Sequence, residues 1–278
     1  MKISEILNIS IKKLEKSGVE NPANDARLLL AHVLDKDVSY IIGHFDENLN
    51  EEQISRYEDF VDRRAKREPL SHITQKRGFW KHEFFVSCDV LDPRPDSETL
   101  IETVLDLYSE TPPKNMLEFG VGSGCLILSL MKEFRDASAM GVDISKKALA
   151  ITKKNATLLD CSLKLVESNW GENINGSFDL IISNPPYIAK SDIEELQPEV
   201  KDYEPYLALS GGDTGLDAFY PLFDSIKKLL AENGFAVLEI GQNQEKEIVK
   251  ISEKYGLKCV RQVSDLAGII RILVFKFN

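Results

Sequence analysis

The segment LEFGVGSGCLILSL, Leu117–Leu130, decides the fold of most of the chain. An apolar run ends at a turn with glycine at positions 120, 122 and 124, and a second apolar run with helical spacing follows. A strand, a glycine-rich turn and a helix in this order are typical of a nucleotide-binding βα unit, because glycine lets the backbone approach a ligand closely. The spacing is G-x-G-x-G, whereas dinucleotide-binding proteins use G-x-G-x-x-G. With the acidic Glu118 before it, the turn favours a cationic nucleoside; a tight turn that binds nothing is the alternative.

The chain around this turn alternates between strands and helices. Helices are expected around 123–133, 145–159, 215–232 and 243–254, and strands at 115–120, 137–143, 162–168, 178–183, 234–241, 257–263 and 270–277. This alternation predicts an α/β fold with a seven-stranded, Rossmann-like sheet that is mostly parallel and covered by helices on both faces. Because the last two strands are close in sequence, we expect the terminal strand to be antiparallel.

Residues 1–96 follow other patterns. Apolar residues recur at helical spacing through residues 1–73, which predicts a small N-terminal helical bundle without catalytic candidates. The aromatic, alternating residues 74–96 predict a β-hairpin linker, and residues 97–278 are then the catalytic domain. The basic run Arg63–Arg67 is interpreted as the solvated face of a helix, with a docking patch as the alternative.

The composition excludes several classes of protein. No apolar run in the 278 residues approaches the ~18–20 residues of a membrane span, and the N-terminus lacks the pattern of a signal peptide. The four cysteines and four histidines show no metal-ligand or disulfide spacing, so we expect free thiols, no metal and a cytoplasmic protein. Nearly all of the net charge of −11 falls on residues 89–278, which disfavours nucleic acid as a partner because acidic domains repel phosphates.

Polar side chains follow two further strands of the predicted sheet. Asp143 ends its strand, where a carboxylate can accept hydrogen bonds from both hydroxyls of a ribose; a helix cap is the alternative, and Ser145 competes for that role. Asn169 and Trp170 follow the next strand and can hydrogen-bond to and stack on an adenine, although Trp170 can equally be a core residue.

The tetrapeptide NPPY, Asn184–Tyr187, follows the fourth strand and lies at the same edge of the sheet. Pro185 and Pro186 fix φ and remove two N–H donors, and Asn184 is held extended because it precedes proline. The loop therefore presents acceptors, and it suits a ligand that brings a planar NH₂ group. Two acceptors can take the two hydrogens, and Tyr187 can cover the flat face of the ligand.

These motifs resemble S-adenosylmethionine-dependent methyltransferases that act on amino nitrogens, and one branch closely: the glutamine methyltransferases of peptide chain release factors, the PrmC/HemK family. The resemblance runs nearly end to end. Its segments are EPLSHITQKRGFW (68–80), LDPRPDSETL (91–100), LEFGVGSG (117–124), SNPPYI (183–188), EVKDYEPYLALSGGDTGLD (199–217) and DLAGIIR (265–271). Glu118 stands where the family often has Asp, and Asn169 where it commonly has Asp.

The resemblance implies methylation of the glutamine side-chain amide in the Gly-Gly-Gln motif of class 1 release factors. The donor would be S-adenosyl-L-methionine, the products N5-methylglutamine and S-adenosyl-L-homocysteine, and the helical domain would dock the substrate. We also expect a monomer. Cofactor contacts are expected from Glu118, Gly120, Val121, Gly122, Ser123, Gly124, Asp143, Ile144, Asn169, Trp170 and Asn184. Substrate contacts are expected from Arg94, Asn184, Pro185, Pro186 and Tyr187, and of these Asn184, Pro185 and Tyr187 would be catalytic.

Three alternatives stay open. A close relative would methylate a glutamine of a ribosomal protein. A nucleic-acid amino-methyltransferase also uses NPPY, but it should show a basic face and a pocket for a flipped base. The third is a non-enzymatic binding module in which the nucleoside site is only vestigial.

Overall fold

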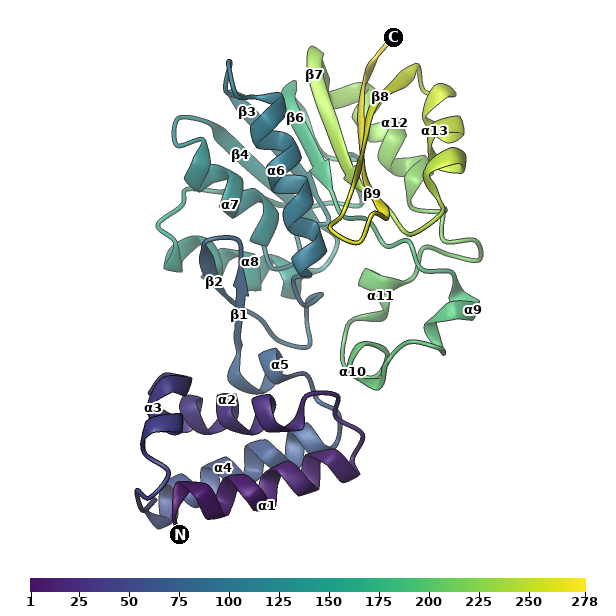
Figure 1. The fold of residues 1–278 in the computed structure, drawn as a ribbon. Helices are drawn as coiled ribbons and strands as arrows, with labels where there is room; N and C mark the ends of the chain where they lie inside the picture. The colour runs from purple at the N-terminus through teal and green to yellow at the C-terminus, as the bar shows by residue number, and fades with distance from the viewer. The chain divides into compact units, whose positions relative to one another are not determined.

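The computed structural model describes residues 1–278 and divides them into two compact units (Figure 1). The helical unit consists of Met1–Lys76 with Gln197–Tyr203, and the sheet unit of Arg77–Leu196 with Glu204–Asn278. The segment 197–203 thus belongs with the helices, although the sequence places it inside the catalytic domain. No helix in the chain combines the length and apolar character that crossing a membrane would require.

The helical unit packs five helices around one apolar core. They are α1 (Ile3–Lys16), α2 (Pro22–Leu34), α3 (Val38–Gly43), α4 (Glu51–Ala65) and α5 (Leu70–Thr74). A capping box starts α4, in which the Asn50 side chain accepts from the backbone of Gln53 and the Gln53 side chain accepts in return. Tyr57 is fully buried in the core, and its hydroxyl donates to the carbonyl of Ala26 at 3.1 Å.

The basic run Arg63–Arg67 spans the C-terminal end of α4, and its three arginines form ion pairs within the helical unit. The Arg64 side chain is only 8% exposed and donates to Asp25 at 2.8 Å and to Glu199 at 2.9 Å. Arg67 donates to both carboxylate oxygens of Glu199, each at 2.6 Å. This differs from the expected solvated face: the charges of these two arginines are used to hold the segment 197–203 against the helices.

The sheet unit contains seven strands in the order β5-β4-β3-β6-β7-β9-β8. Their bounds are β3 (Asn115–Phe119), β4 (Ser138–Asp143), β5 (Lys164–Glu167), β6 (Phe178–Ser183), β7 (Leu230–Glu239), β8 (Leu257–Ser264) and β9 (Ile270–Phe277). The first five strands in this order pair in parallel, whereas β9 is antiparallel to both β7 and β8. This confirms the predicted fold class, including the antiparallel terminal pair.

Helices cover both faces of this sheet (Figure 1). On one face, α12 (Phe219–Leu229) and α13 (Glu245–Glu253) share an apolar cluster with Leu117 and Phe119 of β3. On the other, α6 (Glu98–Leu107), α7 (Cys125–Glu133) and α8 (Lys146–Leu158) pack over Met116. This division follows from the strand period, because successive side chains point to opposite faces.

Short elements complete the two units. The hairpin of β1 (Lys76–Phe79) and β2 (His82–Phe85) forms as the sequence predicts, and Phe79 and Phe84 join the core under α6. A 3-10 turn, η1 (Pro95–Ser97), precedes α6. The chain between β6 and α12 carries only single turns of helix: α9 (Lys190–Ile193), α10 (Pro198–Lys201) and α11 (Tyr206–Leu209).

Candidate active site

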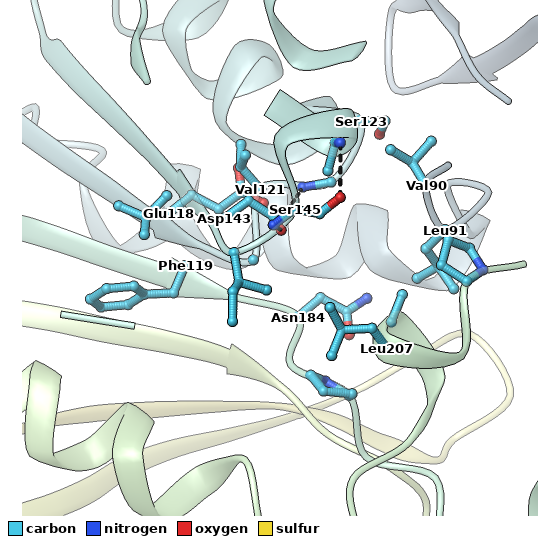
Figure 2. Close-up of a pocket in the computed structure, with 18 of the residues that line it drawn as sticks. Val90, Leu91, Glu118, Phe119, Val121, Ser123, Asp143, Ser145, Asn184 and Leu207 are labelled. Atoms are coloured by element: carbon cyan, nitrogen blue, oxygen red, sulfur yellow. Dashed lines mark hydrogen bonds between the residues drawn. The ribbon is translucent and has the colours of Figure 1, made fainter. Parts of the chain in front are cut away.

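A cavity of about 490 Å³ opens at the carboxyl edge of the parallel strands (Figure 2). Its volume lies in the range of small-molecule sites, and its place is where open α/β sheets bind ligands. The sheet topology explains it: β3, β4 and β6 are neighbours and parallel, so the loops that follow them meet at one edge. The residues that line the cavity come from six segments, which lie within 88–97, 118–126, 142–148, 168–170, 184–186 and 205–208.

The glycine-rich turn after β3 forms part of this wall. Gly120 has φ +68°, and a Cβ there would meet no protein atom within 4 Å, so the space beside it is open to a ligand. Gly124 has φ +80°, and a Cβ there would lie 2.7 Å from the side chain of Thr152. Gly124 does not line the cavity, whereas Gly120, Val121, Gly122 and Ser123 do. The third glycine is therefore required by backbone conformation and packing.

Two carboxylates face the cavity from the ends of β3 and β4 (Figure 2). Glu118 is 2% exposed and accepts from the backbone N–H of Ile127 at 3.0 Å. Burial raises the pKa of Glu118 well above its ordinary value, and the nearby Asp143 raises it further. A bound cation would offset this cost. The site is thus better suited to a positively charged ligand than to a phosphate.

Asp143 is oriented by two backbone groups. One carboxylate oxygen accepts from Gly122 N–H at 3.0 Å, and the other accepts from Ser145 N–H at 2.9 Å. Burial raises the pKa of Asp143 from its ordinary value. The N-cap of α8 is Ser145, whose hydroxyl accepts from Ala148 N–H at 3.2 Å, so Asp143 is not needed as the helix cap.

Asn169 and Trp170 both line the cavity. The amide of Asn169 donates to Glu172 at 2.8 Å. Trp170 packs edge-on against Phe119, with ring centroids 6.2 Å apart, and it is half-buried against the core. The two interpretations of Trp170 are therefore compatible, because one ring both joins the core and borders the cavity.

The NPPY loop is divided between the cavity and the core. Asn184 and Pro186 line the cavity, whereas the structure does not place Pro185 and Tyr187 among its lining residues. The Tyr187 hydroxyl donates to Glu239 at 3.3 Å, and its carbonyl accepts from Gln244 at 2.9 Å. Burial raises the pKa of Tyr187. The ring therefore supports the loop from the β7 side.

Sequence reasoning missed one wall of the cavity. Pro205, Leu207 and Ala208 line it, and the side chain of Arg94 on the opposite segment donates to Glu204 at 2.6 Å. The segment YEPYLAL, residues 203–209, carried a signal: a proline follows an acidic residue, and large apolar residues follow the proline at an otherwise irregular place. No group of three or more His, Cys, Asp or Glu in the chain is arranged to hold a metal ion.

Solved structures share this fold. A methyltransferase from Pyrococcus furiosus aligns with a TM-score of 0.55 and 18% identity, over 77% of this chain and 97% of that one. The ribosomal protein L11 methylase from Lactobacillus delbrueckii subsp. bulgaricus aligns with a TM-score of 0.50 and 16% identity, over 66% and 81%. Family models match as well: the methyltransferase small domain at residues 79–199 and the PrmC N-terminal domain at residues 5–74. Fold and matched domains together define a methyltransferase.

Curated relatives narrow this class. The chain is 37% identical to the release factor glutamine methyltransferase of Caulobacter vibrioides, over 94% of this chain and 92% of that protein, and 35% identical to that of Agrobacterium fabrum, over 99% and 97%. It belongs to the release factor glutamine methyltransferase family, which confirms the resemblance seen in the sequence. It is also 36% identical over 98% of its length to the bifunctional methyltransferase of Rickettsia conorii, of which it spans 57%.

Proposed function

We propose that this protein transfers a methyl group from S-adenosyl-L-methionine to the glutamine side-chain amide in the Gly-Gly-Gln motif of class 1 peptide chain release factors. The products are N5-methylglutamine and S-adenosyl-L-homocysteine. One observation carries the proposal: in a chain of this family, the asparagine of NPPY opens onto the same cavity as the glycine-rich turn, the buried carboxyl group of Glu118 and the half-buried one of Asp143.

The residues of the cavity fit the donor. S-adenosyl-L-methionine supplies a methyl group activated by a sulfonium when it is bound. A sulfonium bound nearby would favour the charged form of Glu118, which burial otherwise disfavours. The backbone groups that orient Asp143 leave its carboxylate able to accept from ribose hydroxyls. We assign Gly120–Ser123, Ile144, Asn169 and Trp170 to the remaining donor contacts, because all of them line the cavity.

Asn184 and Pro185 would activate the amide of the substrate. An amide nitrogen is a poor nucleophile, since its lone pair is delocalised into the carbonyl. Acceptors that bind both of its hydrogens return electron density to nitrogen, and a fixed position next to the donor supplies the proximity term. The methylated amide cation is strongly acidic and can lose its proton to water, so no side-chain base is needed. Tyr187, bound to Glu239 behind the loop, would keep these acceptors in place.

The partner assignments belong to the same proposal. The helical unit would dock the release factor, which its match to the PrmC N-terminal domain supports. We propose that the protein acts as a monomer in the cytoplasm, where its four free cysteines would stay reduced.

Mass spectrometry of purified release factors tests this proposal. Incubation with the protein and S-adenosyl-L-methionine should add one methyl group to the glutamine of Gly-Gly-Gln, and a release factor with that glutamine changed to asparagine should stay unmodified. Ribosomal proteins, DNA and RNA are offered in parallel. Methylation of any of these in place of the release factor would refute the substrate assignment. Donor binding without any transfer, measured by calorimetry, would favour a binding module.

A further inference from the structure

Two segments far apart in the chain meet at the wall of the cavity. Residues 88–97 contribute Pro93 and Arg94, and residues 205–208 follow directly after Glu204. The guanidinium of Arg94 donates to Glu204 Oε1 at 2.6 Å, and the Glu204 side chain is 1% exposed. A charge-assisted hydrogen bond of this length is among the stronger polar contacts in proteins. The pair therefore joins the two segments that border the site.

Burying this ion pair carries a desolvation penalty that its contacts compensate only in part. Glu204 Oε2 is buried without a hydrogen-bond partner, and a second buried carboxylate, Asp92, adds repulsion. Asp92 is itself 3.6 Å from the guanidinium of Arg77. Burial raises the pKa of Glu204 to about 7; Arg94 opposes this shift, and Asp92 adds to it. A buried carboxylate with one cationic partner and a second carboxylate near it contributes little to stability, which points to a positioning role for the pair.

The segment that Glu204 begins is fixed at its other end as well. The N–H of Ile188, next to NPPY, donates to the Leu209 carbonyl at 3.1 Å, and Gly211 N–H donates to the Ile188 carbonyl at 2.8 Å. Between these two fixed points lies α11, with Tyr206 57% and Leu207 59% exposed. Leu207 lines the same cavity as Asn184 (Figure 2). The large apolar side chain of Leu207 is thus exposed beside the proposed amide-binding loop, whereas Tyr206 does not line the cavity.

We propose that the Arg94–Glu204 ion pair positions Leu207, with Pro205 and Ala208, as an apolar rim for the release-factor peptide that carries the target glutamine. The inference rests on the proposed function. The rim is continuous with the cavity, and this identifies the ligand that contacts it. A glutamine side chain that reaches Asn184 brings its own main chain to the mouth of the cavity, where Leu207 lies. Glycines beside that glutamine let the peptide backbone lie close to the rim. Arg94 and Glu204 are positioning residues, and the rim residues contact the substrate.

Glu204→Gln tests the ion pair, because it removes the charge and keeps both polar atoms. At pH 8 we expect the KM for the release factor to rise about tenfold, the loss of one charge-assisted hydrogen bond. The Kd for S-adenosyl-L-methionine should stay within about twofold, since Glu204 does not line the cavity. The double variant Arg94→Gln with Glu204→Gln should be no worse than the worse of the two single variants. Multiplied effects, or an unchanged KM, would overturn the inference.

Leu207→Ala tests the rim without disturbing the core. The matched control is Leu158→Ala, because Leu158 is 63% exposed and does not line the cavity. We expect Leu207→Ala to raise the KM for the release factor and Leu158→Ala to leave it unchanged, while the two variants have equal melting temperatures. Equal KM values for the two variants would contradict the rim.

Hydrogen exchange separates this inference from the proposed function. In Glu204→Gln, the backbone amides of residues 206–209 should exchange faster than in the unsubstituted protein, whatever the substrate is. A protein that methylates no release factor would refute the function alone. Unchanged exchange of these amides would refute the role of the ion pair.

Discussion

Two glutamates of the segment EVKDYEP have opposite environments. Glu199 lies in the helical unit, where Arg64 and Arg67 bind both of its oxygens. Burial raises the pKa of Glu199, but the hydrogen bonds from Arg67 and Arg64 outweigh it, and the pKa is lowered. Glu204 lies in the sheet unit with one arginine, one unpartnered oxygen and a second carboxylate near it, and its pKa rises to about 7.

The difference shows how charge can be used for stability or for position. A carboxylate bound by two guanidinium groups has its desolvation compensated, so ionisation favours the folded state. A carboxylate with one cation and a like charge beside it is folded at a cost, which proteins tolerate at functional sites.

The largest effect is expected at the cavity, with Asn184→Ala. We expect kcat for release-factor methylation to fall about 100-fold or more, since one preorganised polar contact to the reacting amide is lost. Donor affinity, measured by calorimetry, should change little, and so should the melting temperature. If turnover were unchanged while the donor still bound, the amide-binding role of Asn184 would be wrong.

Glu199→Ala should have the largest effect on stability. It leaves the buried guanidinium of Arg64 with Asp25 as its remaining carboxylate, and breaking such a pair costs about 3 kcal/mol. Denaturant unfolding followed by circular dichroism measures the loss. The matched control is Asp62→Ala, which breaks an exposed pair with Lys13 and should cost less than about 1 kcal/mol. Equal losses in the two variants would contradict the structural role of Glu199.

These two glutamates also show what could be predicted from the sequence. The strands could be predicted, because apolar runs bounded by turns indicate buried strands. A parallel sheet then brings the polar residues at the strand ends, Glu118, Asp143 and Asn184, to one edge. The ion-pair partners of Glu199 and Glu204 could not be predicted from the sequence. Arg94 precedes Glu204 by 110 residues, and pairing over such a separation leaves no periodic pattern. Only the packed fold determines which carboxylate meets which cation.

The orientation of the Tyr187 side chain could not be predicted from the sequence either, because its contacts are also distant in sequence. Its position after two prolines predicts a ring that covers the flat face of a ligand. In the structure the ring packs beside Gly241, where a Cβ would lie 3.1 Å from it. The hydroxyl finds Glu239 at the end of β7. A neighbouring strand, distant in sequence, decides this side chain.

The dependence of stability on pH should have opposite signs at the two glutamates. Glu204 has a raised pKa in the folded state, so its favourable contribution is complete below about pH 4.5 and is lost as the pH rises through about 7. Glu204→Gln should therefore gain about 2 kcal/mol over the unsubstituted protein between pH 5 and pH 8. Glu199 has a lowered pKa, so its contribution is present above about pH 4.5 and is lost as the pH falls further. Denaturant unfolding of Glu204→Gln and Glu199→Gln at several pH values measures both; slopes of the same sign would contradict the comparison.

The smallest effect is expected for Tyr187→Phe. It removes one hydrogen bond of 3.3 Å to Glu239 and keeps the ring in the core, so we expect a loss of less than about 1.5 kcal/mol of stability. Because Tyr187 supports the acceptors of the NPPY loop from behind, kcat should fall by only a few-fold, far less than with Asn184→Ala. Steady-state kinetics with saturating donor measure this ratio. If Tyr187→Phe lowered kcat as much as Asn184→Ala does, the tyrosine hydroxyl would have to act on the substrate itself, and its contact with Glu239 would have to change during the reaction.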